Sequence, residues 1–331
     1  MHNLRKKGIL LPFWRKRCIC ISTANRSSTT SETSEEEANV TTLTKATGQG
    51  RPILSVDMDG TALESNNTVH PCVGIVLQEA AETGMSIVFT SDTSRQGLVM
   101  QMARIGLRPE YVAGFACENG AYSANCTIPG MPKEQWFAPD GPMQKQLYRR
   151  MRDLTVECFI ELGWQIFLTH PFSTVEHMTR IAPISDTLVL VDNTRLVSMT
   201  MAVRGIKLDG TLEDDPSHYR RVGEAFRRVV EPLIGGGPLR PEIGDTFIDC
   251  CAVGARKSDP VQAMRATGRP VYHFGDGGND RCVSGVDGVV VVAVGANTTL
   301  GRSGAAHHVT INHGPEGLIE AVREVISLHT T

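Results

Sequence analysis

The sequence has little net charge, no long apolar run and no C-x-x-C cysteine pair. Its formal net charge is -3 over 331 residues, which gives no reason to expect a nucleic-acid or membrane partner. No window of about 20 consecutive apolar residues occurs, so no segment is expected to span a bilayer. Its nine cysteines include no C-x-x-C pair, which favours reduced thiols over disulfides or a zinc site. What remains is the composition of an ordinary soluble globular protein, long enough for about two domains.

The first 50 residues differ from everything after them. Six Lys and Arg residues precede a Ser/Thr-rich stretch, and no apolar periodicity connects the segment. We therefore predict a disordered N-terminal tail over residues 1–50. Because no acidic residue precedes Glu32, the segment also suits an organelle transit peptide. If the tail has no targeting function, we expect a cytoplasmic protein. Organelle targeting by this segment is the alternative.

From residue 51 the chain alternates between short apolar strands and amphipathic helices. This rhythm predicts βαβ units and a parallel sheet, first over residues 51–122 and again over 251–331. Residues 123–250 break it with two strong helices, at 142–163 and 217–233, among strands that include a hairpin. We predict an α/β protein in which a doubly wound parallel sheet, a Rossmann-like core, carries an inserted α+β domain at 123–250.

Polar residues follow four of the predicted core strands. In a parallel sheet these strand ends lie on one edge, where open α/β sheets bind ligands. Carboxylates gathered there would repel one another unless a cation lay among them, and oxygen ligands without Cys or His favour Mg²⁺. Taken alone, the first cluster could also be a surface turn or part of a calcium loop. The clusters are Asp57 with Asp59, Ser91, Glu118-Asn119-Gly120, and Asp276 with Asn279 and Asp280.

These motifs, in this order and with Lys257 before the last of them, closely resemble the haloacid dehalogenase superfamily of phosphatases. The turn at 118–121 and the large insert resemble its Cof-type branch, which includes sugar-phosphate phosphatases. The resemblance covers about residues 51–325. Two positions depart from the family pattern, since Ser91 stands where Thr is commoner and Ser258 follows Lys257 where Gly is usual. The neighbouring Arg256, or Lys207 in the insert, could substitute for Lys257.

The resemblance implies a Mg²⁺-dependent phosphatase that works through an aspartyl-phosphate. Asp57 would be the nucleophile, and Asp59 would protonate the leaving oxygen and then activate water. Ser91 and Lys257 would bind the phosphate of the substrate. The metal would lie at Asp57-Met58-Asp59, where Met58 offers its backbone carbonyl, and at Asp276 and Asp280. Supporting roles fall to Gly60, Thr61, Asn119 and Asn279.

The expected partner is a small phosphorylated metabolite, bound by a monomer or a homodimer. The inserted domain, or cap, would close over the core and select the leaving group. A phosphosugar mutase of the same superfamily is an alternative, although such enzymes separate the acids of the last motif by a longer loop. A catalytically silent sugar-phosphate sensor is another, although a binding protein would not need both Asp57 and Asp59.

Overall fold

The computed structural model describes residues 43–64, 68–138, 141–169, 180–234, 239–243, 247–252 and 254–330. Residues 1–42 of the predicted tail or transit segment therefore lie outside the described residues. The last part of the predicted tail range does belong to the folded structure. Leu43 and Ala46 are buried in the main core, and the N–H of Ala46 donates to the Tyr272 hydroxyl at 2.8 Å.

Within the described residues, eight strands form one sheet in the order β14-β13-β12-β1-β2-β3-β4-β5. The strands from β14 to β3 run parallel, whereas β4 and β5 are antiparallel additions at one edge. This core sheet therefore continues past residue 122, where we predicted its first part to end. The strands are β1 (Ile53–Asp57), β2 (Ser86–Thr90), β3 (Val112–Cys117), β4 (Tyr122–Ala124), β5 (Gln135–Trp136), β12 (Val271–Gly275), β13 (Val289–Ala293) and β14 (His308–Val309).

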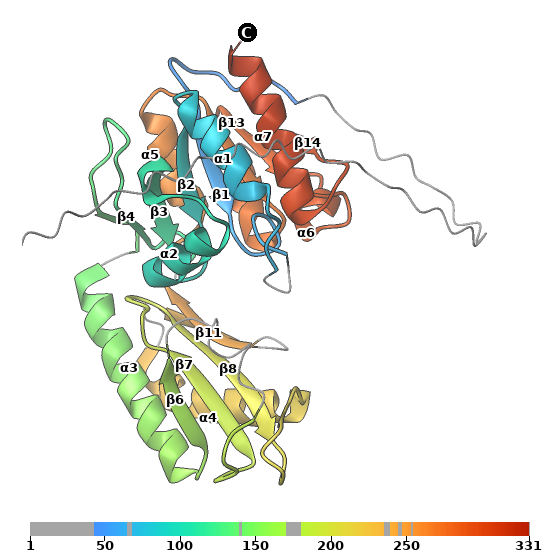
Figure 1. The fold of residues 1–331 in the computed structure, drawn as a ribbon. Coiled ribbons are helices and arrows are strands. Elements are labelled where there is room, and N and C mark those ends of the chain that lie inside the picture. The colour runs from blue at the N-terminus through green and yellow to red at the C-terminus, as the bar shows by residue number, and fades with distance from the viewer. Residues whose placement is uncertain are drawn as a thin grey trace, which may run out of the picture. The chain divides into compact units, whose positions relative to one another are not determined.

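Helices cover both faces of the core sheet, as Figure 1 shows. Apolar residues of α1, α2 and α7 share one buried cluster with the sheet, and residues of α5, η2 and α6 share another. The core strands are buried along nearly their whole length, as in a parallel sheet covered on both sides. The helices are α1 (Val73–Glu82), α2 (Arg95–Arg104), η1 (Pro109–Tyr111), α5 (Ser258–Ala266), η2 (Gly278–Gly285), α6 (Thr299–Arg302) and α7 (Gly314–Thr330).

The cap, residues 141–252, is built on a second sheet with the order β10-β11-β8-β7-β6, to which β9 adds by pairing with β8. Its neighbours are antiparallel except β6 and β7. Helices α3 and α4 contribute to one buried cluster with this sheet. The predicted α+β layout and its hairpin, β7 with β8, are therefore present. The elements are α3 (Gly141–Glu161), β6 (Gln165–Thr169), β7 (Thr187–Asp192), β8 (Met199–Ile206), β9 (Leu212–Glu213), α4 (Pro216–Ile234), β10 (Leu239–Ile243) and β11 (Phe247–Ala252).

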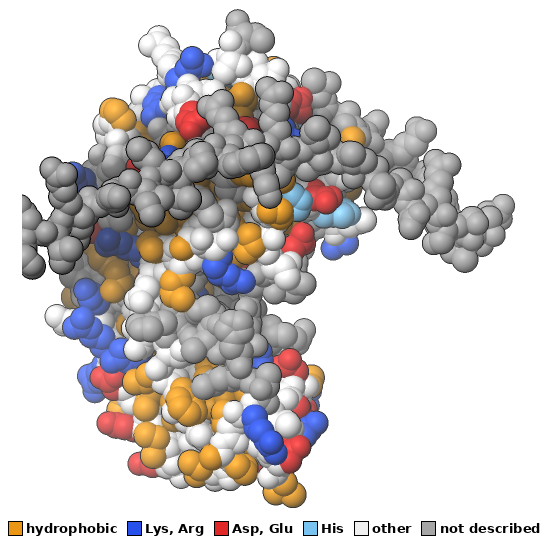
Figure 2. Space-filling view, viewed as in Figure 1, with side chains coloured by type: hydrophobic (Ala, Val, Ile, Leu, Met, Phe, Trp, Pro, Cys, Tyr) orange, Lys and Arg blue, Asp and Glu red, His pale blue; other side chains and the backbone are white. Residues whose placement is uncertain are grey.

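The surface mixes charges of both signs. Figure 2 shows basic and acidic side chains interspersed with apolar ones on one face of the molecule. None of the helices in the described part of the chain is long and apolar enough to cross a membrane.

Candidate functional site

The residues singled out from the sequence come from neighbouring strands. The sheet order places β12, β1, β2 and β3 side by side and parallel. Their carboxyl ends therefore share one edge, which is where such sheets bind ligands. Asp57 is the last residue of β1, Ser91 follows β2, Glu118 follows β3 and Asp276 follows β12. The short strands stop here because glycines and polar residues interrupt each apolar run.

The centre of the site is a buried ion cluster around Lys257. The Lys257 Nζ lies 2.7 Å from Asp57 Oδ1 and 2.9 Å from Asp280 Oδ1, and its side chain is 2% exposed. Burial alone would lower the pKa of this ammonium group, but Asp280 and Asp57 outweigh that effect and raise it. The alternative Lys207 pairs instead with Glu213 in the cap, at 3.0 Å. Of these two lysines, Lys257 is the one that lies at the predicted nucleophile.

Three carboxylates at this edge form a candidate cation site. Ligand oxygens of Asp57, Asp276 and Asp280 all lie within 4.8 Å of one another. Burial and the charges of Asp280 and Asp276 raise the pKa of Asp57, and Lys257 opposes this shift. A divalent cation among these carboxylates would relieve the repulsion. The donor set consists only of oxygen, which fits Mg²⁺.

Gly60 and Thr61 shape the approach of Asp276. Gly60 has a φ of +78°, and a Cβ at this position would lie 2.3 Å from Asp276 Oδ2. Only glycine combines this backbone conformation with so close a neighbour. The Thr61 hydroxyl donates to Asp276 Oδ1 at 3.3 Å. Gly60 and Thr61 therefore support the carboxylate of Asp276, which lies more than 200 residues away in sequence.

The Met58 carbonyl, which we predicted as a metal ligand, takes part in the turn after β1. Its oxygen accepts the N–H groups of Thr61, Ala62 and Leu63 at 3.3, 2.9 and 2.8 Å. These three hydrogen bonds hold the turn that follows β1. The Met58 side chain is buried in the core. The sequence could not reveal this because the tight turn after β1 determines where the carbonyl points.

Asp59 is placed and tuned as a proton-transfer group would be. Gln101 of α2 donates its Nε2–H to Asp59 Oδ1 at 3.0 Å. The residue reaches solvent, yet desolvation of its carboxylate, reinforced by the charge of Asp92, raises the pKa to about 6. A carboxyl with a pKa near neutrality can both give and take a proton. No sequence pattern pointed to Gln101, because only the packing of α2 brings it to Asp59.

Three other predicted residues, Ser91, Asn119 and Asn279, differ in their burial and in their contacts. Ser91 is buried, its Oγ accepts the Thr93 N–H at 3.2 Å, and its backbone carbonyl accepts the Asn119 N–H at 3.1 Å. Asn119 has a φ of +57°, and its buried Oδ1 has no hydrogen-bond partner among the described residues. Asn279 lies exposed at the start of η2, close to Gly277. The structure thus brings Ser91 and Asn119 together and leaves Asn279 at the surface.

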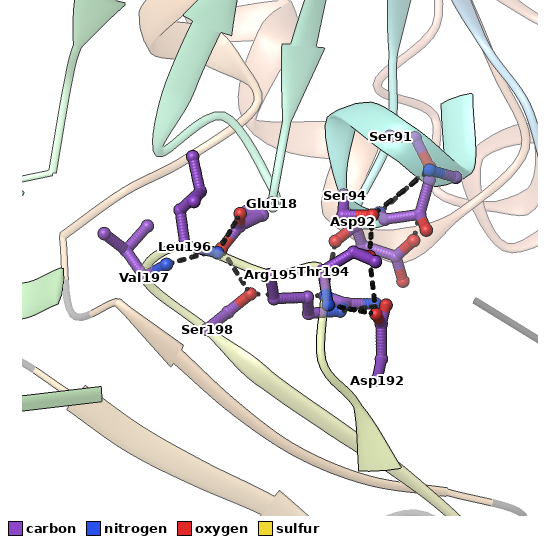
Figure 3. A network of polar contacts seen from close by, with 12 residues as sticks. Ser91, Asp92, Ser94, Glu118, Asp192, Thr194, Arg195, Leu196, Val197 and Ser198 are labelled. Atoms are coloured by element: carbon purple, nitrogen blue, oxygen red, sulfur yellow. Dashed lines mark hydrogen bonds and ion pairs between the residues drawn. The ribbon is translucent and has the colours of Figure 1, made fainter. Parts of the chain in front are cut away.

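A second polar network joins the core to the cap through Glu118 (Figure 3). This buried carboxylate accepts the N–H groups of Leu196 and Val197 at 2.7 and 2.8 Å. It also accepts the Ser198 hydroxyl at 2.7 Å. Burial raises the pKa of Glu118, while Arg195 and these hydrogen bonds oppose the shift. Glu118 has a φ of +53°, a conformation that is uncommon for this residue and is found at functional sites.

The same cap turn, residues 193–198, also contacts the loop that carries Ser91. The Arg195 Nη1 donates to the Asp92 carbonyl oxygen at 2.6 Å, and the Ser94 and Thr194 hydroxyls are 2.6 Å apart. Asp192 holds the turn itself by accepting from Thr194 and Arg195. The phosphate-binding loop predicted at Ser91 is therefore connected to the cap.

Comparison with known proteins identifies the fold. No protein-family model matches the chain, and no curated protein matches it. Solved structures do match. A haloacid dehalogenase-like hydrolase from Bacteroides thetaiotaomicron matches with a TM-score of 0.54 and 15% identity, over 84% of this chain and 100% of that chain. A hypothetical protein from Geobacillus kaustophilus matches with a TM-score of 0.51 and 18% identity, over 84% and 100%. A trehalose-6-phosphate phosphatase related protein matches at 0.50 and 13%, also over 84% and 100%.

At these identities the likeness establishes the architecture. The fold is that of the haloacid dehalogenase-like proteins, with a Rossmann-like α/β core. This confirms the fold class that the alternation of short strands and helices predicted.

The pKa of Asp59 predicts how activity responds to pH. If Asp59 protonates the leaving group, kcat/KM should fall as the pH rises through about 6. Asp92→Asn removes a charge that raises this pKa, so the fall should begin at lower pH. Gln101→Leu removes a hydrogen bond that lowers the pKa, so the fall should begin at higher pH. Profiles of kcat/KM against pH for the three proteins test this, and shifts of both variants in the same direction would contradict it.

The Glu118 network predicts a specific loss of stability. In Glu118→Gln an amide NH₂ replaces one acceptor oxygen and, in either orientation of the amide, faces a backbone N–H that can only donate. We expect the free energy of unfolding to fall by about 1–3 kcal/mol. The control Glu79→Gln, on the exposed side of α1, should change it by less than about 0.5 kcal/mol. Chemical denaturation measures both, and equal midpoints for the two variants would refute the role of Glu118.

Proposed function

We propose that this protein is a Mg²⁺-dependent phosphomonoester hydrolase that acts on a sugar phosphate or a similar small phosphorylated metabolite. One observation carries the proposal. The carboxylate of Asp57, a second carboxyl at Asp59 with a pKa near 6 and the buried ammonium of Lys257 lie together at the carboxyl edge of the sheet. Phosphoryl transfer needs such a nucleophile, a proton donor and positive charge for the transferring oxygens.

The substrate phosphate would bind where positive charge and hydroxyl donors are available. Lys257 supplies the charge, and Ser91 supplies a hydroxyl in the loop after β2. Asp57, Asp276 and Asp280 would hold Mg²⁺. When bound, the ion would neutralise phosphate oxygens and help to orient the phosphoryl group.

The reaction would proceed in two steps. In the first, a carboxylate oxygen of Asp57 attacks phosphorus, and the bond from phosphorus to the leaving oxygen breaks while Asp59 gives that oxygen a proton. The product alcohol leaves, and the phosphoryl group remains on Asp57. In the second, Asp59 takes a proton from a water molecule whose oxygen attacks phosphorus. The Asp57 carboxylate is thereby restored and inorganic phosphate is released.

The substrate class rests on the resemblance to the Cof-type branch and on the cap. The cap turn at residues 193–198 contacts the Ser91 loop, so a bound phosphate ester would have cap residues near its leaving group. A sugar or polyol has hydroxyls that such polar side chains can bind. Proteins of this class place specificity in the cap, which excludes water as it closes.

The proposal predicts release of inorganic phosphate that depends on both Mg²⁺ and Asp57. A panel of sugar phosphates, assayed with Mg²⁺ and with EDTA, should show release only with the metal. Asp57→Asn should lower kcat by roughly 10⁴-fold or more while the protein stays folded. The control Asp153→Asn, at a side chain that is 61% exposed on α3, should retain full activity. Isomerised sugar phosphate without phosphate release would indicate a mutase, and binding without turnover would indicate a sensor.

A further inference from the structure

One polar residue is buried inside an otherwise apolar core strand. β12 has the sequence Val-Tyr-His-Phe-Gly and is buried throughout, and His273 at its centre is 0% exposed. The register of the sheet pairs His273 with Ser55 of β1. A histidine in this position is costly unless both ring nitrogens find partners. Its role does not follow from apolar packing, and none of the site motifs includes it.

Both ring nitrogens of His273 have polar neighbours. Nδ1 lies 3.0 Å from the Ser55 hydroxyl oxygen, and Nε2 lies 3.0 Å from Asp280 Oδ1. The Ser55 hydroxyl is in turn 3.5 Å from that of Thr90 on β2. A chain of polar contacts therefore crosses three neighbouring strands and ends on the carboxylate that holds Lys257.

The other partners of Asp280 determine the direction of these hydrogen bonds. Lys257 Nζ donates to Oδ1 at 2.9 Å, and the Gly277 N–H donates to Oδ2 at 3.0 Å. A carboxylate surrounded by donors is ionised and can only accept. The Nε2 of His273 must therefore carry a hydrogen, and in the neutral ring Nδ1 accepts from Ser55. Two donors, Lys257 Nζ and His273 Nε2, then bind the same oxygen of Asp280.

We propose that His273 is a positioning residue that fixes the Asp280 carboxylate and thereby holds the Lys257 ammonium at Asp57. The proposal rests on the proposed function, in which Lys257 binds the phosphate and faces the nucleophile. Without the Nε2–H donor, the Asp280 carboxylate can turn away from Lys257 toward its remaining backbone donor. The ammonium then loses its second anchor, and its position relative to Asp57 is no longer fixed.

Two amide substitutions separate the two hydrogen bonds of His273. The side-chain amide of Asn matches the position of Nδ1, so His273→Asn keeps the contact with Ser55 and loses the donor to Asp280. The longer Gln matches the position of Nε2, so His273→Gln keeps the donor to Asp280. If the donor positions Lys257, His273→Asn should lower kcat/KM by roughly 10- to 100-fold, whereas His273→Gln should stay within about threefold of the parent. A residue that only packs would give equal losses in the two variants.

His308 provides a control for the loss of a buried histidine. It is buried in β14 at the edge of the same sheet, and β13 separates it from β12 and β1, whose ends carry Asp276 and Asp57. His308→Asn should lower the unfolding midpoint and leave kcat/KM within about twofold of the parent. A loss of activity as large as that of His273→Asn would overturn the proposal.

NMR spectroscopy gives a measurement that does not depend on turnover. In the unmodified protein, ¹⁵N spectra should show His273 protonated at Nε2. The Lys257 ammonium should be protected from exchange in the parent and in His273→Gln, and it should lose this protection in His273→Asn. A proton on Nδ1 with none on Nε2, or an equally protected ammonium in both variants, would overturn the proposal.

If the parent released no phosphate, the proposed function would fail, while these spectra would still decide the role of His273. They also decide it if His273→Asn does not fold, since the protonated nitrogen is read from the parent.

Discussion

The site depends on one buried ion cluster, in which the Lys257 ammonium lies between Asp57 and Asp280. A buried ammonium is costly unless its charge is paired and its hydrogens have acceptors. Here the pairing joins the end of β1, the start of α5 and the first turn of η2. Three segments that lie far apart in sequence are thus held at one edge of the sheet. Removing Lys257 would leave the Asp57 and Asp280 carboxylates without their shared counter-charge, so the architecture and the chemistry are linked at this point.

The charges of the cluster also explain why a metal ion is expected. Three carboxylates and one ammonium leave two negative charges in excess. Burial makes that excess unfavourable, as the raised pKa values of Asp57 and Asp276 indicate. A divalent cation would balance it, and Asp57 would then be ionised, as the proposed nucleophile must be. Lys257 and the cation would share the carboxylates of Asp57 and Asp280. The ammonium would supply positive charge to the substrate phosphate, and the cation would balance the remaining negative charge of the cluster.

Much of this architecture could be predicted from the sequence because it depends on short-range patterns. Apolar runs identified β1, β2, β3 and β12, and polar residues at their ends identified Asp57, Ser91 and Asp276. The rest depends on geometry that a linear pattern does not contain. The strands β4 and β5 have three and two residues, too few for a periodic signal, and so the core extends past the predicted boundary at residue 122. In the turn after β1 the Met58 carbonyl accepts backbone hydrogen bonds. His273 was hidden in an apolar run, and Gln101 and Glu118 gain their roles only from the packing of α2 and of the cap turn.

Asp57 is the residue proposed to accept the phosphoryl group of the substrate. The most direct test is rapid acid quenching during turnover of an active sugar phosphate, followed by mass spectrometry of the peptide that contains residues 53–61. We expect a phosphorylated peptide that forms and decays on the timescale of turnover, with the modification on Asp57. Steady release of phosphate with no modified peptide at any time would contradict it, since water would then attack the substrate directly.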